Sequence, residues 1–290
     1  MPTIGVGTMD IRELESALGA RYDGCYASGH MGASILRFRR ADNVGLVLKY
    51  ASAENAQALS DLEGNIHGYE QMKANGASFL VPPDVQVVNV PSGVALAMRD
   101  LGKNTTTLNE GIHTWRVVAE NLEGAVRATV QRNEAWYAEE VFTHMRKFVP
   151  NDEIEARFRR AVRTQRNGRS ALMLLDLTPD NMFVSGESAW FLDPWRQTTY
   201  QGHPGVSLGQ FATLVRIYGL RDAQPAFQMF EELAVRRVSS ILECEERASM
   251  TAFRLGQTLQ LVLSAHVRRD TEPEKAQALY QEALDIMNDL

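Results

Sequence analysis

The sequence DLTPDN at residues 176–181, followed by FLDPW at residues 191–195, decides how this chain is interpreted. It places Asp176 and Asn181 five residues apart in a loop that contains a proline, and Asp193 follows after a short apolar run and a turn. Phosphoryl transfer from ATP requires such a set, because one carboxylate orients the attacking hydroxyl while an amide and a second carboxylate hold magnesium. Oxygen ligands of this kind suit Mg²⁺. The stretch therefore predicts phosphoryl chemistry, whereas an isolated Asp-x4-Asn would more often be a surface turn.

The composition is that of an ordinary globular protein. The 290 residues include 44% hydrophobic and 23% charged residues, and the formal net charge is −6. This acidic balance argues against nucleic acid as a partner, because phosphate backbones are bound by basic surfaces. The two cysteines, Cys25 and Cys244, do not make a disulfide framework and match no zinc-binding spacing. With no apolar run long enough for a membrane span and no signal-peptide pattern, we expect a cytoplasmic protein without a membrane partner.

The hydrophobic pattern changes character near Gly102. Before it, alternating apolar residues and turn residues predict strands, and three- and four-residue spacing predicts two helices. The expected elements are strands at 22–27, 34–39, 45–50, 85–90 and 94–98, and helices at 10–19 and 54–75. Beyond Gly102 a helical pattern fills 108–165 and resumes from Val206 to the C-terminus. We therefore predict two domains, 1–101 and 102–290, the first β-rich and the second mostly helical.

A loop of small residues lies between the first two predicted strands. It contains Ser28, Gly29 and Gly32. Such a loop allows backbone N–H groups to approach phosphates without interference from side chains. Glycines are also common in hairpin turns, so the loop alone is a weak indication of a nucleotide site.

Lys49 lies at the end of the third predicted strand, where alternation can turn its side chain inward. A lysine that contacts phosphates is normally held by an acidic residue of the next helix. That helix carries Glu63 and Glu70, which lie seven residues apart on one face, and either could be the partner.

These features follow one another in the order found in kinases: the small-residue loop, the strand lysine, a helix glutamate, the hinge candidate, Asp-x4-Asn and Leu-Asp. Over about residues 20–215 the chain resembles the protein-kinase-like superfamily, and within it the aminoglycoside phosphotransferase/choline kinase type. Thr178, where Ser/Thr protein kinases carry lysine, and the lack of an Ala-Pro-Glu motif after Asp193 favour this small-molecule branch. The resemblance implies a two-lobed, protein-kinase-like α+β fold.

The resemblance also implies roles for three residues of the predicted second lobe. Asp176 would orient the substrate hydroxyl, and Asn181 and Asp193 would hold Mg²⁺. Two positions depart from the family pattern. Leu174-Leu175 stands where a His-Gly or His-Arg pair usually precedes the catalytic Asp, and Ser207 stands where an Asp is common at a helix start.

In the first lobe, the resemblance implies that Lys49 contacts the ATP phosphates together with the small-residue loop. It favours Glu70 over Glu63 as the partner of the lysine, because the segment that follows Glu70 is similar to the strand entry of antibiotic kinases. Met98 and Arg99 lie where the family joins its lobes and binds adenine through the backbone.

We therefore expect an ATP- and Mg²⁺-dependent phosphotransferase that acts on a hydroxyl of a small molecule, such as an aminoglycoside-like antibiotic or an amino-alcohol. Two alternatives remain open. The first is a pseudokinase-like module that binds a nucleotide or partner without transfer, and the second is a divergent protein kinase. The sequence does not indicate an oligomeric state.

Overall fold

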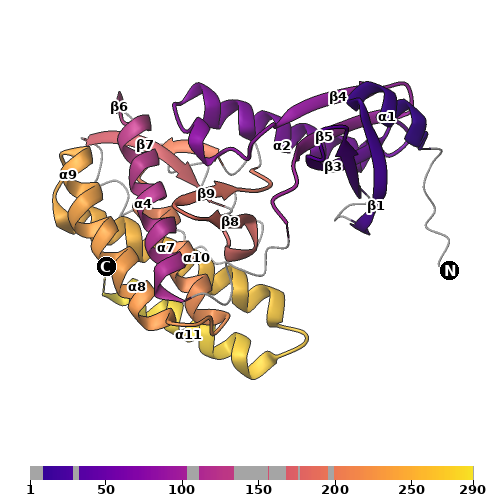
Figure 1. The fold of residues 1–290 in the computed structure, drawn as a ribbon. Coiled ribbons are helices and arrows are strands. Elements are labelled where there is room, and N and C mark those ends of the chain that lie inside the picture. Colours follow the sequence, from indigo (N-terminus) through magenta and orange to yellow (C-terminus); the bar gives the residue numbers. More distant parts are fainter. Residues whose placement is uncertain are drawn as a thin grey trace. The chain divides into compact units, whose positions relative to one another are not determined.

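The computed structural model describes residues 9–28, 33–102, 111–133, 156, 168–175, 177–194 and 199–289. The chain divides into two compact units (Figure 1). As far as their residues are described, the first comprises Met1–Ala74, Ser78–Lys103 and Trp190–Gln197, and the second comprises Asn75–Ala77, Asn104–Ala189 and Thr198–Leu290. Each unit has a hydrophobic core of its own.

The first unit is built on a five-stranded antiparallel sheet in the order β1-β2-β3-β5-β4. The strands are β1 (Ala20–Ser28), β2 (Ser34–Arg40), β3 (Gly45–Ser52), β4 (Gln86–Val90) and β5 (Gly93–Arg99). Alternation turns Leu36, Phe38, Leu46 and Leu48 into the core, where they meet Leu14 of helix α1 (Ile11–Leu18). The sheet thus presents one apolar face to α1.

Helix α2 (Ala56–Ala74) packs on β3 and β5 in the same unit. It begins after Asn55, whose side-chain oxygen accepts a hydrogen bond from the Ala58 N–H at 3.0 Å. Its buried positions include Ala58, Leu62, Tyr69 and Met72, which recur at three to seven residues and form one face. A short 3-10 helix, η2 (Ser78–Leu80), follows.

The second unit is mostly helical. Its helices are α4 (Ile112–Thr129), α7 (Gly205–Ile217), α8 (Ala223–Glu232), the π-helical η5 (Leu233–Val238), α9 (Ser239–Leu242), α10 (Glu246–Arg268) and α11 (Pro273–Asn288). A three-stranded sheet orders β10 (Thr199–Gly202), β7 (Gly168–Leu174) and β6 (Gln131–Asn133). The 3-10 turn η3 (Pro179–Asn181) precedes the hairpin of β8 (Met182–Ser185) and β9 (Ser188–Phe191).

The fold class predicted from the sequence is confirmed, because a β-rich first part is followed by a mostly helical second part. The prediction of helix throughout 108–165 is wrong at 131–133, where β6 pairs with β7. For 108–110 and 134–165, which apart from 156 lie outside the described residues, it stays a prediction, as do the domain boundaries. Within the described ranges, no helix combines the length and apolar character that crossing a bilayer requires.

Two glycines allow α7 and α10 to approach each other closely. A Cβ atom on Gly256 would collide with the backbone carbonyl of Val206, and one on Gly209 would collide with that of Phe253. Both obstacles are backbone atoms of the opposite helix, so a side-chain rotation cannot remove them. The core of the second unit, which includes Val206 and Leu259, therefore depends on the absence of these two side chains.

We predict that Gly256→Ala lowers the free energy of unfolding by about 2 kcal/mol or more, because overpacking forces the two backbones apart. Urea unfolding measures this effect. The control is Thr251→Ala on the same helix, a half-exposed position that should change stability little. If Gly256→Ala were as stable as the control, the close approach of the helices would be wrong.

His203 is a fully packed histidine at the start of α7. Its Nδ1 accepts a hydrogen bond from the Gly205 N–H at 3.1 Å, so the neutral ring carries its proton on Nε2. Nε2 lies 3.1 Å from Ser249 Oγ, and Cys244 Sγ lies 3.8 Å away. Burial lowers the pKa of His203 to about 4, because charging the ring there would cost solvation. The histidine therefore links α7 to the start of α10 as a neutral group.

His203 makes stability depend on pH. Its pKa is lowered from 6.5 to about 4 on folding, so the unfolded chain binds more protons between these values. The contribution of the neutral ring to the free energy of unfolding is complete above pH 6.5 and is lost as the pH falls toward 4. We predict a loss of about 2 kcal/mol from this group between pH 7 and pH 5. Urea unfolding of wild type and His203→Gln at both pH values tests this, since the variant should lack that part of the decrease.

Candidate functional site

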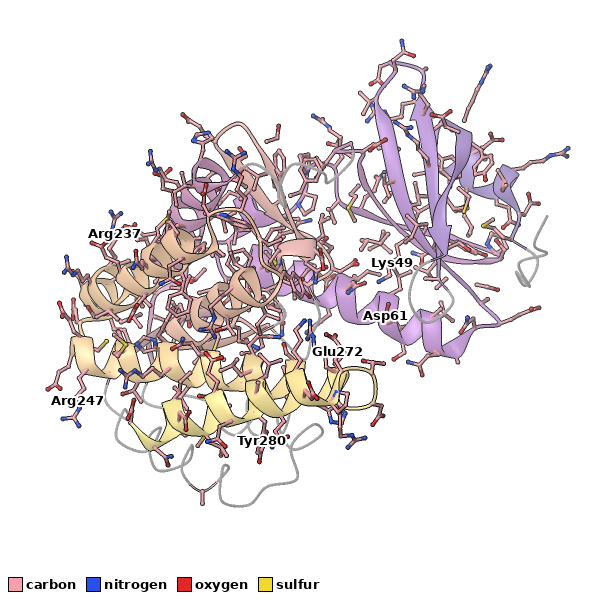
Figure 2. The ribbon with its side chains drawn as sticks, turned by 90° about the horizontal axis from the view of Figure 1, so that it is seen from below. Lys49, Asp61, Arg237, Arg247, Glu272 and Tyr280 are labelled. Carbon is pink, nitrogen blue, oxygen red and sulfur yellow. The ribbon has the colours of Figure 1, made fainter. Side chains whose placement is uncertain are left out.

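The ammonium group of Lys49 lies in a polar cluster within the first unit. Lys49, labelled with Asp61 in Figure 2, lies on β3 and is 8% exposed. Its Nζ lies 2.6 Å from Asn65 Oδ1 and 2.9 Å from Asp61 Oδ2. Asp193 Oδ1 lies 3.6 Å from the same nitrogen. A buried charge is tolerated only when it is paired and hydrogen-bonded. The cluster meets this condition with one carboxylate and one amide from α2 and a second carboxylate from the Leu-Asp segment.

Asp61 and Asn65 reach Lys49 together because they are four residues apart on α2 and therefore share a face. Asn65 also donates from Nδ2 to the carbonyl oxygen of Pro194 at 3.1 Å. One turn further on, Gly68 faces the same peptide, and a Cβ atom there would lie 2.5 Å from the Pro194 oxygen. The helix thus contacts both the lysine and the residue after Asp193.

Asp193 has a left-handed backbone conformation, with φ at +50°. Aspartate adopts this conformation more readily than most residues. Its side chain remains 47% exposed, so its carboxylate can accept further ligands. Tyr69 of α2 lies next to it, and burial together with the negative charge of Asp193 raises the pKa of the tyrosine well above its usual value.

The predicted pairing of Lys49 with Glu70 is wrong. The Glu70 carboxylate is 69% exposed and lies 3.7 Å from His67 Nδ1. The alternative, Glu63, is also exposed. Glu63 and Glu70 share a face of α2, as predicted, but that face points to solvent. The acidic partner is Asp61, which the sequence analysis did not single out.

The catalytic-loop segment belongs to the second unit, and Asp176 lies outside the described residues. After it, Leu177 is fully buried, and Thr178 caps the turn η3 by accepting a hydrogen bond from the Asn181 N–H at 3.3 Å. Pro179 occupies the first turn position, which needs no N–H donor. The loop therefore fixes the backbone of Asn181, whose predicted role as a metal ligand remains a proposal.

Ser207 is a buried residue near the start of α7 that hydrogen-bonds a backbone group. Its Oγ accepts a hydrogen bond from the N–H of Leu174 at 2.8 Å, and the residue is 5% exposed. Leu174 is the last residue of β7, two residues before Asp176. Ser207 thereby satisfies a buried backbone donor at the point where the strand leads into the loop.

The small-residue loop is described only at its edges. Ser28 ends β1 and pairs with Ser34 at the start of β2, whereas the side chain of Ser28 and both Gly29 and Gly32 lie outside the described residues. Their predicted contact with phosphates therefore stays a prediction.

Met98 and Arg99 lie at the end of β5, opposite Val47 and Leu46 of β3. The N–H of Arg99 donates to the Pro83 carbonyl at 2.9 Å, and its guanidinium pairs with Asp84 at 3.0 Å. The Arg99 N–H is therefore already used within the unit. An adenine contact at this residue would need its carbonyl.

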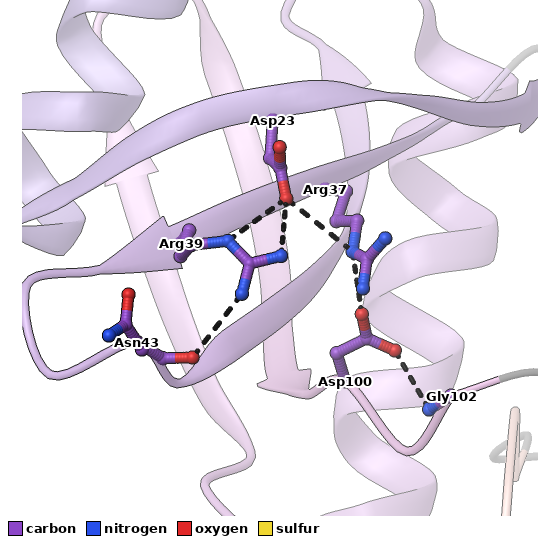
Figure 3. A network of polar contacts seen from close by, with 6 residues as sticks. All are labelled: Asp23, Arg37, Arg39, Asn43, Asp100 and Gly102. Atoms are coloured by element: carbon purple, nitrogen blue, oxygen red, sulfur yellow. Dashed lines mark hydrogen bonds and ion pairs between the residues drawn. The ribbon is translucent and has the colours of Figure 1, made fainter.

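An ionic network anchors the residues just after β5 (Figure 3). Arg37 Nε lies 2.7 Å from the carboxylate of Asp100, whose side chain is 4% exposed. The other carboxylate oxygen of Asp100 accepts a hydrogen bond from the Gly102 N–H at 2.9 Å. Asp23 is the extra residue of a bulge in β1 and contacts both Arg37 and Arg39. This network fixes the chain from Asp100 to Gly102.

The metal-binding prediction rests on Asn181 and Asp193, which belong to different units of the described part of the chain. There, no group of three or more histidine, cysteine, aspartate or glutamate side chains could hold a metal ion. Asp193 offers one exposed carboxylate, and Asn181 offers an amide, which is the hard oxygen chemistry that Mg²⁺ accepts.

Three of the solved structures with a similar fold are two kinases and a phosphotransferase. The amicoumacin kinase hAmiN in complex with AMP-PNP, Ca²⁺ and Ami has a TM-score of 0.57 and 10% identity, covering 97% of this chain and 94% of that chain. An aminoglycoside phosphotransferase from Alicyclobacillus acidocaldarius has a TM-score of 0.53 and 10% identity, covering 98% and 94%. The choline kinase LicA from Streptococcus pneumoniae has a TM-score of 0.54 and 13% identity, covering 97% and 98%.

The chain has a protein-kinase-like fold. The likeness extends over nearly the whole of this chain and of each similar structure, so the fold recognised from the sequence is confirmed. No protein-family model and no curated protein sequence matches the chain.

A signal for the missed residues was present in the sequence. Buried positions of α2 recur from Ala58 through Leu62 to Tyr69, and Asp61 and Asn65 fall within that stripe. A polar residue on an apolar stripe needs a partner when it is buried. Lys49, on the preceding strand, could have been recognised as the partner that these two polar residues need.

We predict that Asp61→Asn lowers the free energy of unfolding by about 2 kcal/mol, because a buried ammonium loses its charged partner while side-chain size is kept. Glu63→Gln and Glu70→Gln, on the exposed face, should each change it by less than about 0.5 kcal/mol. Urea unfolding at neutral pH compares the three variants. A larger loss in Glu70→Gln than in Asp61→Asn would contradict the pairing.

Proposed function

We propose that this protein is an ATP- and Mg²⁺-dependent phosphotransferase that transfers the γ-phosphate to a hydroxyl of a small molecule. The observation that carries the proposal is the buried Lys49, held by Asp61 and Asn65 beside Asp193, in a chain with a protein-kinase-like fold. The similar structures named above are small-molecule kinases, which supports this substrate class.

Lys49 is suited to bind the phosphates of the nucleotide. An ammonium group has three N–H donors. Asp61 and Asn65 accept two of these hydrogen bonds, and the third direction is open to Asp193 or to a phosphate oxygen. The two partners on α2 hold the charge in place before the nucleotide arrives, so binding requires little reorganisation.

Asp193 and Asn181 would hold the magnesium ion. Asp193 fits this role because its carboxylate is half exposed and already faces a cation at 3.6 Å. When bound, the ion neutralises charge on the transferred phosphoryl group. The residues of the chain supply positioning, and no covalent intermediate with the protein is required.

Asp176 would orient the substrate hydroxyl and accept its proton as the new phosphate ester forms. The oxygen–phosphorus bond to the nucleotide breaks at the same time, and ADP leaves. Thr178 and Pro179 preorganise the loop after Asp176, and Ser207 anchors the strand before it.

The acceptor in this proposal is an aminoglycoside-like antibiotic or an amino-alcohol, so antibiotic resistance is one expected role. Both compound classes carry hydroxyl and amino groups. We expect the reaction to take place in the cytoplasm, where ATP and Mg²⁺ are available and the two cysteines remain reduced.

We predict that Asp176→Asn lowers kcat about a thousandfold while Mg-ATP binding stays nearly unchanged, because only the group that receives the proton is lost. Asp193→Asn should instead weaken Mg-ATP binding. ADP release with Mg-ATP and a panel of aminoglycosides, nucleoside antibiotics and amino-alcohols identifies the acceptor, and thermal shifts report nucleotide binding. The control is Asp180→Asn, an exposed residue of the same loop.

The outcomes separate the proposal from its alternatives. Nucleotide binding without turnover of any hydroxyl compound would favour a binding module. Phosphate transfer to a protein acceptor, with none to small molecules, would favour a divergent protein kinase. A chain that binds no nucleotide, or full turnover in both Asp176→Asn and Asp193→Asn, would overturn the proposal.

A further inference from the structure

Asn65 makes two buried hydrogen bonds of opposite kind. Its Oδ1 accepts from Lys49 Nζ at 2.6 Å, and its Nδ2 donates to the Pro194 carbonyl at 3.1 Å. An ammonium can only donate and a carbonyl can only accept, so the two partners fix the orientation of the amide. Asn65 is 3% exposed, and therefore water does not compete for either bond.

The peptide that Asn65 holds is the one that follows Asp193. Asp193 has the left-handed conformation described above, which the surrounding structure must maintain. Gly68 and Tyr69 complete the surface of α2 beneath this turn: Gly68 leaves room for the Pro194 carbonyl, and the Tyr69 hydroxyl is buried there. Asn65 is the residue of this surface that hydrogen-bonds both the turn and Lys49.

We infer that Asn65 is a positioning residue that couples the Lys49 ammonium to the Asp193–Pro194 turn, so that the phosphate-binding and metal-binding groups are aligned by one amide. This inference rests on the proposed function for its catalytic consequence. Both hydrogen bonds lie within the first unit, and the bond from Lys49 to Asn65 has a readout that needs no catalysis.

Two substitutions separate the two bonds. Asn65→Asp keeps an acceptor for Lys49 but cannot donate to Pro194, and its carboxylate would face the carbonyl oxygen. Asn65→Leu has a similar size and loses both bonds. The matched control is Asn55→Ala, which removes the cap of the same helix and touches neither Lys49 nor the turn.

The first measurement is the rate at which an amine-acylating reagent modifies Lys49 in the full-length chain, followed by mass spectrometry of its peptide. We predict modification about fivefold faster in Asn65→Leu, because the lysine loses one of the acceptors that hold its ammonium group in the buried cluster. Asn65→Asp should react no faster than wild type, and Asn55→Ala should behave as wild type.

The second measurement is the Mg²⁺ concentration for half-maximal activity, with KM for ATP and kcat determined separately. We predict that Asn65→Asp raises the Mg²⁺ requirement about tenfold, because the Asp193–Pro194 turn loses its donor. Asn65→Leu should raise both the Mg²⁺ requirement and KM for ATP. Thermal unfolding of each variant, including Asn55→Ala, separates these effects from a general loss of stability.

The two measurements distinguish the possible failures. If wild type neither binds nor turns over ATP, the proposed function is wrong, and the acylation rates still test whether Asn65 holds Lys49. If wild type is active but Asn65→Asp keeps the wild-type Mg²⁺ requirement, the coupling to Asp193 is overturned. If Asn55→Ala reproduces the changes of Asn65→Leu, a positioning role is likewise overturned.

Discussion

The structure of the candidate site depends on the need to satisfy one buried ammonium group. Lys49 lies on a strand among apolar neighbours and is 8% exposed, so without partners its charge would be strongly unfavourable there. Asp61 and Asn65 supply these partners from a single face of α2. The requirement therefore fixes how α2 is rotated against the sheet, and that rotation decides which of its polar residues face inward.

The same rotation brings α2 against the segment that contains Asp193. Gly68 permits a backbone approach that any larger residue would block, and Asn65 bonds the Pro194 carbonyl. Three features of the first unit, the lysine, the helix face and the Asp193 turn, thus form one arrangement. Its charge is distributed among an ammonium and two carboxylates, of which Asp193 is the more exposed. In the proposed function, this accessible carboxylate beside a held cation would receive the nucleotide with its metal ion.

In the second unit, backbone hydrogen bonds prepare the loop that carries the other proposed groups. Ser207 satisfies the N–H of Leu174, and Thr178 caps the turn that leads to Asn181. The Ser207 hydroxyl thus supports the backbone at the point where β7 leads into the loop. The close contact of α7 with α10, which Gly209 and Gly256 allow, holds the helix on which Ser207 lies.

The sequence by itself determined the fold class, the strand that carries Lys49, the helix after it and the segment around Asp193, because apolar periodicity and turn residues are local signals. The sequence correctly placed Glu63 and Glu70 on one face of the helix, but it did not show that this face points to solvent. Asp61 and Asn65 were equally visible as residues. Only the tertiary structure decided which of these residues of α2 meet Lys49. The rotation of the helix is set by the packing of Leu62 and Tyr69 and by the need to pair a buried charge, and these contacts join residues from separate elements of the chain.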